Sequence, residues 1–341
     1  MGQGLLERKV IIVSGKGGVG KSTVSAILAR LASRLKMRVL VIQSDPNIDA
    51  PVNLHNMLDS HPFGDKEKEL HPGLWAVRTD PETAMRYSLQ SVIPTKFLFE
   101  QFFQNDLVQG LSEAVPGLRE AFIIYYVHAM AVHGSHRRRF DLIVWDAPPT
   151  GHLPLYLKAP QILQRMFNTG YVARVLNGLH DFLRDHEKVA ISLVTLPEET
   201  PVSETLQLIE QIRAEQLGQL GGIALNAYPY PILTEAEAAE CRRLLDTPAD
   251  RTSAAAFYDG QVEGLGTEML AAAQRRLDVE AAARDAIRPL TTLGLPLWTI
   301  PHFRRGRVTL AEVDDSVDRW LKEPRLRRLL VGDHVPTGTA L

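Results

Sequence analysis

The amino-acid sequence predicts an α/β fold: a doubly wound, mostly parallel sheet of the P-loop NTPase type with an inserted helical subdomain. Short apolar runs that suit buried strands alternate with longer segments of helical periodicity, as in a parallel sheet covered on both faces. The first run, Val10-Ile11-Ile12-Val13, is separated from the helical residues 24–35 by a glycine-rich loop. The 341 residues, 45% hydrophobic and 23% charged, suffice for one such domain, which we place at residues 8–330.

The glycine-rich loop, Ser14-Gly15-Lys16-Gly17-Gly18-Val19-Gly20-Lys21-Ser22-Thr23, matches the pattern G-x-x-x-x-G-K-[ST] in full. Its backbone N–H groups would face phosphate oxygens at the positive end of the following helix. Lys21 would reach the β- and γ-phosphates of a nucleotide, and the Ser22 hydroxyl would coordinate Mg²⁺. The alternative, a flexible glycine turn before a helix, is disfavoured by the complete match. The predicted binding residues are Gly15, Gly17, Gly18, Val19, Gly20, Lys21, Ser22 and Thr23.

A second lysine, Lys16, follows the first glycine of the loop. The resulting form, G-K-G-G-x-G-K-[ST], resembles the deviant Walker A loop of the dimeric ATPases that include MinD, ParA, the arsenical pump and the nitrogenase iron protein. This resemblance implies that Lys16 crosses a dimer interface to the partner's nucleotide. A cation supplied in this way is worth roughly 10³–10⁵ in rate. The alternative is that Lys16 is a solvated loop lysine.

The second buried strand, residues 38–42, leads to Asp45 at the edge of the sheet where open α/β folds place their chemistry. Asp45 is our candidate for the group that orients or deprotonates the attacking water. The alternative is an Asp-Pro turn that closes the strand. Asp49 is a weaker candidate on the same loop. Residues 53–73 are expected to form an irregular surface connection.

The third buried strand, residues 140–146, ends at Asp146, which is placed to hold the Mg²⁺ shell, through water. The stiff turn that follows could sense a γ-phosphate through its backbone N–H groups. We therefore predict a switch segment formed by Pro148, Thr150, Gly151 and His152.

Two helical stretches flank this strand. Residues 94–136 carry a cluster of four phenylalanines, Phe97, Phe99, Phe102 and Phe103, at helical spacing. Together with residues 153–186, the stretch 94–136 would form the helical subdomain. Phenylalanines in such a pattern are usually core, and the alternative is a hydrophobic surface for a partner or client helix. Before them, residues 74–77 suit a short strand, and Asp80 suits the N-cap of a helix that begins at Pro81.

The remaining sequence continues the alternation of short apolar strands and longer helices. Strands are expected at residues 189–194, 222–226 and 297–300, and helices at 235–245 and 266–290. Ser203-Glu204-Thr205 is expected to cap a further helix. A final helix should begin near Thr309 and run to about residue 330, before a loose tail at residues 331–341.

The run Asp146-Ala147-Pro148-Pro149-Thr150-Gly151-His152 resembles the D-T-A-P-T-G-H signature of the arsenical-pump ATPase and of the Get-pathway ATPase that targets tail-anchored membrane proteins. With the loop and Ser44-Asp45-Pro46, it makes residues 8–325 similar to the anion-transporting ATPase family. The resemblance implies hydrolysis of ATP with Mg²⁺ by a homodimer or by a heterodimer with a related ATPase. It also implies a hydrophobic-helix client or membrane-protein partner, and adenine contacts from Asn226, Pro301, His302 and Phe303. For Asn226 the alternative is a polar cap at a strand end.

The chain departs from the family pattern in its cysteine and methionine residues, whose sulfur atoms are soft ligands. One cysteine, Cys241, cannot build an arsenite site of several thiolates, and no C-x-x-C zinc motif is present. Only Met130 and Met166 fall clearly within the helical subdomain, so a methionine-rich client surface is thin. These departures disfavour arsenite binding and weaken, without excluding, the binding of a client helix.

The amino-acid composition limits the partners and the cellular compartment that we expect for this protein. A net charge of −2 leaves no global field for nucleic acid, so no nucleic-acid partner is expected. Low cysteine usage and the lack of an apolar span favour the cytoplasm. Two other readings stay open: a positioning switch like MinD or ParA, and a low-activity subunit of a heterodimeric ATPase.

Overall fold

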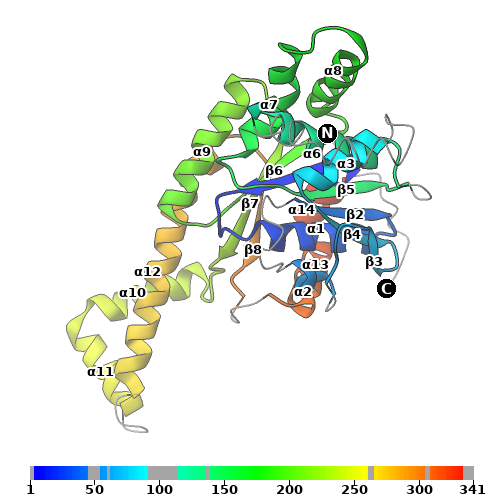
Figure 1. Ribbon diagram of the computed structural model, residues 1–341. Coiled ribbons are helices and arrows are strands. Elements are labelled where there is room, and N and C mark those ends of the chain that lie inside the picture. Colours follow the sequence, from blue (N-terminus) through cyan, green and yellow to red (C-terminus); the bar gives the residue numbers. More distant parts are fainter. Residues whose placement is uncertain are drawn as a thin grey trace.

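A parallel β-sheet organises the computed structural model, which describes residues 4–44, 54–59, 62–90, 114–135, 139–259, 265–303 and 308–332. Within these residues the sheet has eight strands in the order β3-β4-β2-β5-β1-β6-β7-β8, and only β3 runs antiparallel to its neighbour (Figure 1). The strands are β1 Val10–Gly15, β2 Val39–Ser44, β3 Lys68–His71, β4 Leu74–Thr79, β5 Leu142–Asp146, β6 Val189–Thr195, β7 Leu220–Tyr228 and β8 Leu297–Pro301. The predicted α/β class is confirmed.

Successive residues of the central strands enter two different cores. In β1, Val10 and Ile12 pack into one hydrophobic cluster, whereas Ile11 and Val13 pack into another on the opposite face. Side chains alternate across a strand, so a strand covered on both faces must be apolar at every position. This explains why the strands appear in the sequence as continuous apolar runs.

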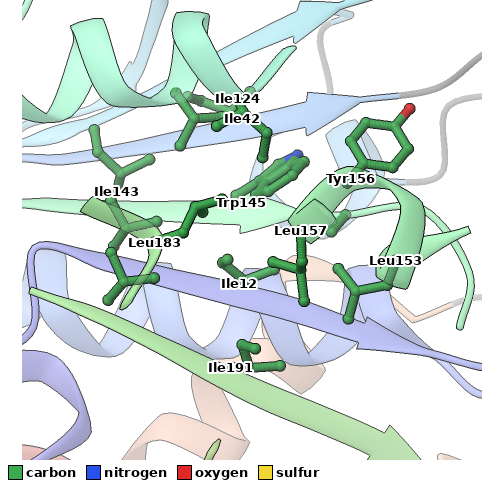
Figure 2. Packing of buried hydrophobic residues seen from close by; sticks show 14 of the residues in the cluster. Ile12, Ile42, Ile124, Ile143, Trp145, Leu153, Tyr156, Leu157, Leu183 and Ile191 are labelled. Atoms are coloured by element: carbon green, nitrogen blue, oxygen red, sulfur yellow. The ribbon is translucent and has the colours of Figure 1, made fainter. Parts of the chain in front are cut away.

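Helices cover both faces of the sheet. One face carries η1 Leu5–Glu7, α1 Lys21–Arg34, α2 Leu54–Leu58, α13 Leu310–Lys322 and α14 Pro324–Val331. The other face carries α3 Pro81–Gln90, α6 Leu118–Val132, α7 Leu153–Gln164, α8 Gly170–Arg184 and α9 Glu199–Ala214. Figure 2 shows this second core, in which Trp145 of β5 meets α7. The ring centroids of Trp145 and Tyr156 are 5.9 Å apart.

Three further helices extend away from the sheet at one end of the molecule (Figure 1). They are α10 Glu235–Asp246, α11 Pro248–Asp259 and α12 Leu265–Thr291. Thr234 and Glu237 form a capping box that starts α10, and Leu245 and Leu277 share a small separate core. None of the helices in the described ranges is long and apolar enough to cross a bilayer.

Several predicted boundaries were wrong. Residues 53–73, expected to be irregular, contain α2 and β3, and α11 was not predicted. Helix α9 begins at Glu199, one turn before the predicted cap, because Pro201 lies in the first turn, where a backbone N–H has no helical partner. The single helix expected from Thr309 is interrupted at Glu323, since Pro324 disfavours the helical conformation of the residue before it.

Other local predictions agree with the structure. Thr309 caps α13 in a capping box with Glu312. The Asp80 carboxylate accepts hydrogen bonds from the backbone N–H groups of Glu82 and Thr83 at the start of α3, as an N-cap does. At the other end of the chain, Val331 is buried as the last residue of α14 and is not part of a loose tail. Residues 333–341 lie outside the described residues.

The described part of the predicted helical subdomain consists of α6, α7 and α8. Residues 94–113 and 136, and with them the clustered phenylalanines, lie outside the described residues. The two methionines differ sharply: Met130 of α6 is fully buried, whereas the side chain of Met166, in the turn after α7, is 57% exposed. Met130 is therefore a core residue, and only Met166 is available to a partner.

The burial of His128 in α6 should make the stability of the protein depend on pH. Its ring packs edge-on against Phe182, with centroids 4.8 Å apart, and burial lowers the pKa of His128, with a smaller contribution from the nearby charge of His133. The native state therefore binds this proton less readily than the unfolded chain, and the free energy of unfolding should fall as the pH drops below about 6.5. Urea unfolding at pH 7.5 and pH 5.5 measures the difference, which should be smaller in His128→Gln. Equal pH dependence in both proteins would contradict this assignment.

Candidate active site

The glycine-rich loop connects the end of β1 to the start of α1 through an unusual backbone. Gly18 and Gly20 have φ values of +84° and +89°, a left-handed conformation that costs other residues steric strain. A Cβ atom added to Gly17 or Gly18 would meet no heavy atom within 4 Å, so their backbone borders open space. Val19 is buried and anchors the loop. The backbone at Gly17 and Gly18 is therefore open to an approaching phosphate group.

Gly20 provides a direct test of this backbone. A Cβ atom there would lie 2.0 Å from the Asn226 Nδ2 atom, in addition to the strain of the positive φ. We expect Gly20→Ala to destabilise the protein by about 1–3 kcal/mol and to weaken nucleotide binding. Thermal unfolding and nucleotide titration measure the two effects. Gly17→Ala, which meets no atom, is the matched control, and equal behaviour of both variants would contradict the expectation.

The two lysines of the loop have different partners. The Lys21 ammonium donates a hydrogen bond to the Lys16 carbonyl oxygen at 3.3 Å, so its side chain folds back over the loop. Lys16 forms an ion pair with Glu204 of α9, with 2.5 Å between Nζ and Oε1. Their side chains are 39% and 37% exposed. Lys16 is thus held by its own chain and remains partly accessible.

Three side chains meet where β5 ends beside α1. The Ser22 hydroxyl donates a hydrogen bond to Asp146 Oδ2 at 2.7 Å, and Ser25 donates to Asp146 Oδ1 at 3.2 Å. The Asp146 residue is only 5% exposed. A hydroxyl and a carboxylate are the hard oxygen donors that Mg²⁺ prefers, so the predicted metal residues are adjacent and chemically suited to it. Ser25 was not predicted, although it lies one helical turn after Ser22.

The parallel pairing of β1 with β5 explains why Asp146 lies beside the start of α1. Val13 of β1 is directly opposite Asp146 of β5, so both strands reach the same edge of the sheet together. Within the described residues, no group of three or more histidine, cysteine, aspartate or glutamate side chains could hold a metal by itself. The metal assignment therefore depends on Ser22 and Asp146 together with phosphate oxygens.

The predicted switch segment is hydrogen-bonded to the base of the loop. The Ser14 hydroxyl donates to the Pro148 carbonyl oxygen at 2.8 Å, and the Thr150 backbone N–H donates to the Gly15 carbonyl oxygen at 3.0 Å. Gly151 borders open space, and His152 is the exposed N-cap residue of α7. Two hydrogen bonds therefore connect the base of the loop to the segment that precedes α7.

A cavity of about 790 Å³ lies at the carboxyl ends of β7 and β8. Of the predicted adenine contacts, Pro301 and His302 line it. Asn226 lies beside the loop, where its Nδ2 atom donates to the Val19 carbonyl oxygen at 2.9 Å. Its Oδ1 atom is buried and, among the described residues, accepts no hydrogen bond, which suits the amino group of a base. Phe303 instead packs against the core on the α1 face.

Two tyrosines and an arginine of this cavity were not predicted. The rings of Tyr228 and Tyr230 are 5.6 Å apart, and the Arg319 guanidinium lies 5.5 Å from the centre of the Tyr230 ring. The run Tyr228-Pro229-Tyr230 after a buried strand was a visible signal for the aromatic pair. Arg319, on α13, could not be linked to it from the sequence.

Two predicted catalytic residues remain to be placed. Asp45 and Asp49 lie outside the described residues. The residue before Asp45, Ser44, is fixed at the end of β2, where its hydroxyl oxygen accepts a hydrogen bond from Trp145 Nε1 at 2.7 Å. The role of Asp45 stays a prediction.

Comparison with known proteins points to one family. A family model described as anion-transporting ATPase matches residues 8–177, which include the loop, Asp146 and the switch segment. The chain is 34% identical over 175 residues to ATPase get3 of Schizosaccharomyces japonicus, a match that covers 48% of each protein. It is 32% identical to ATPase GET3 of Rhodotorula glutinis, over 48% of this chain and 45% of that protein. These matches span about half the length of the two fungal relatives.

A third relative is matched over a longer stretch. The chain is 26% identical over 307 residues to ATPase BagA of Mycobacterium tuberculosis, which covers 86% of this chain and 87% of that protein.

Proposed function

Because this chain belongs to the anion-transporting ATPase family, we propose that it is a Mg²⁺-dependent ATPase that acts as a nucleotide-switched dimer in the targeting of membrane proteins. The observation that carries the proposal is the complete phosphate-binding loop with Ser22 and Asp146 in contact at its helix end. We place the protein in the cytoplasm, where a single cysteine needs no disulfide partner.

Each residue has a proposed role in hydrolysis. The loop backbone and Lys21 bind the phosphates of ATP, and the open space beside Gly17 and Gly18 leaves room for them. Ser22 and Asp146 would hold Mg²⁺, which when bound neutralises charge on the phosphate oxygens. Asp45 positions the attacking water. The backbone of residues 148–152 reports the γ-phosphate to α7, because it is hydrogen-bonded to the same strand end.

A second protomer is required to complete this site. Lys16 supplies its ammonium to the partner's nucleotide only after it leaves Glu204 of its own chain. ATP would favour the dimer in which this exchange has occurred, as in other switches that couple nucleotide state to domain closure. A homodimer and a heterodimer with a related ATPase both satisfy this requirement.

An exposed apolar surface supports binding of a hydrophobic client helix. Met166 and Phe167, in the turn after α7, are 57% and 39% exposed, and Tyr171 and Val172 at the start of α8 are 56% and 48% exposed. Four large apolar side chains are thus exposed within seven residues of the chain, and we take them as a patch that a hydrophobic partner could cover. The patch follows the switch segment by one helix, which links it to the nucleotide.

The experiment is a capture from cell extract. Asp45→Asn should bind Mg-ATP and hydrolyse it slowly, which traps the nucleotide-bound form. We expect proteins with one apolar helix to co-purify with this variant. Adding Phe167→Asp should remove them. Met269→Asp should not, because this similarly exposed residue lies near the start of α12, a helix that extends away from the sheet (Figure 1). Recovery of only a related ATPase would contradict targeting and favour a heterodimer. ATP-dependent sedimentation with liposomes would favour a positioning switch.

A further inference from the structure

A second cavity lies away from the nucleotide site, between α6 and α8. It has a volume of about 310 Å³, within the usual range for small-molecule pockets. The apolar side chains of Ala129, Val175 and Leu179 form part of its wall. Gly178 of α8 also lines it, and a Cβ atom there would meet no heavy atom within 4 Å. The glycine thus leaves space that any larger residue would occupy.

The polar lining of this cavity is entirely basic or neutral. Arg174 contributes from α8, His128 from α6, and His133 from the position directly after α6. Tyr125 and Tyr171 add two hydroxyl groups and two ring surfaces. No acidic residue appears among the described residues that line the cavity. Arg174 also forms no ion pair with the described residues, so its guanidinium meets no carboxylate among them.

This pairing of a cationic group with an apolar wall specifies the chemistry of a ligand. A guanidinium binds carboxylates through two parallel hydrogen bonds, while rings and aliphatic side chains contact an apolar body. We propose that the cavity between α6 and α8 binds a small organic carboxylate with an aromatic or aliphatic body, held by Arg174 and seated against Gly178. The proposal does not depend on ATP hydrolysis.

Calorimetric titration of the full-length protein tests this site. The probe is naphthalene-1-carboxylate, with the uncharged amide of the same shape as its control. The carboxylate should bind saturably with one site per chain and the amide much more weakly. Arg174→Gln, at an exposed position, should weaken binding of the carboxylate about tenfold or more.

Two further variants locate the ligand. Gly178→Leu should abolish binding by filling the cavity, whereas Gly178→Ala should retain most of it. Circular dichroism shows whether α8 is preserved in both. The proposal is overturned if the carboxylate does not bind, if the amide binds equally well, or if Arg174→Gln and Gly178→Leu bind like the wild type.

Discussion

Replacing Lys16 with alanine is expected to slow ATP hydrolysis about 10³–10⁵-fold while ATP binding is largely retained. The ammonium would act on charge that develops during hydrolysis, whereas the resting nucleotide is held by the loop backbone and Lys21. In the structure the Lys16 ammonium lies on Glu204 of the same chain, so it does not contribute to its own phosphate site. Single-turnover hydrolysis and nucleotide titration separate the two effects. A variant that loses binding and hydrolysis equally would show that Lys16 serves only to bind ATP.

Glu204→Gln is the companion variant, and it should favour assembly of the dimer. The substitution removes the charge that holds Lys16 in its own chain, and both side chains are more than one-third exposed, so the fold should tolerate it. We expect a larger dimer fraction with ATP than in the wild type, measured by sedimentation velocity. An unchanged dimer fraction would mean that release of Lys16 from Glu204 does not limit assembly.

Replacing Asp146 with asparagine is expected to lower kcat about 10²–10³-fold. The Asp146 carboxylate is buried and accepts hydrogen bonds from both Ser22 and Ser25, so a neutral amide of the same shape keeps the packing but removes the negative charge beside the metal. The Mg²⁺ concentration for half-maximal activity should rise as well. Hydrolysis measured across a Mg²⁺ titration provides both quantities.

Ser25→Ala is the matched control for Asp146. It removes the 3.2 Å hydrogen bond to Oδ1 and leaves the carboxylate and Ser22 in place. Its effect on kcat should be at most about tenfold, because Asp146 keeps its negative charge and its hydrogen bond from Ser22. If Asp146→Asn were as active as Ser25→Ala, Asp146 would have no special relation to the metal.

The sequence by itself determined the loop, the strand that carries Asp146 and the α/β class. Each of these is encoded by neighbouring residues: glycines permit the left-handed backbone at Gly18 and Gly20, and an apolar run between loops produces a buried strand. The break between α13 and α14 is also encoded locally, by Pro324.

Only the tertiary structure decided which side chains meet. Lys16 and Glu204 are 188 positions apart and become neighbours through folding of the α/β domain that contains β1 and α9. The cavity beside Gly178 likewise exists because α6 and α8, separated by a strand and another helix, pack on the same face of the sheet. Local patterns specify backbone conformation, but contacts across such distances depend on strand order and helix packing, which adjacent residues do not encode.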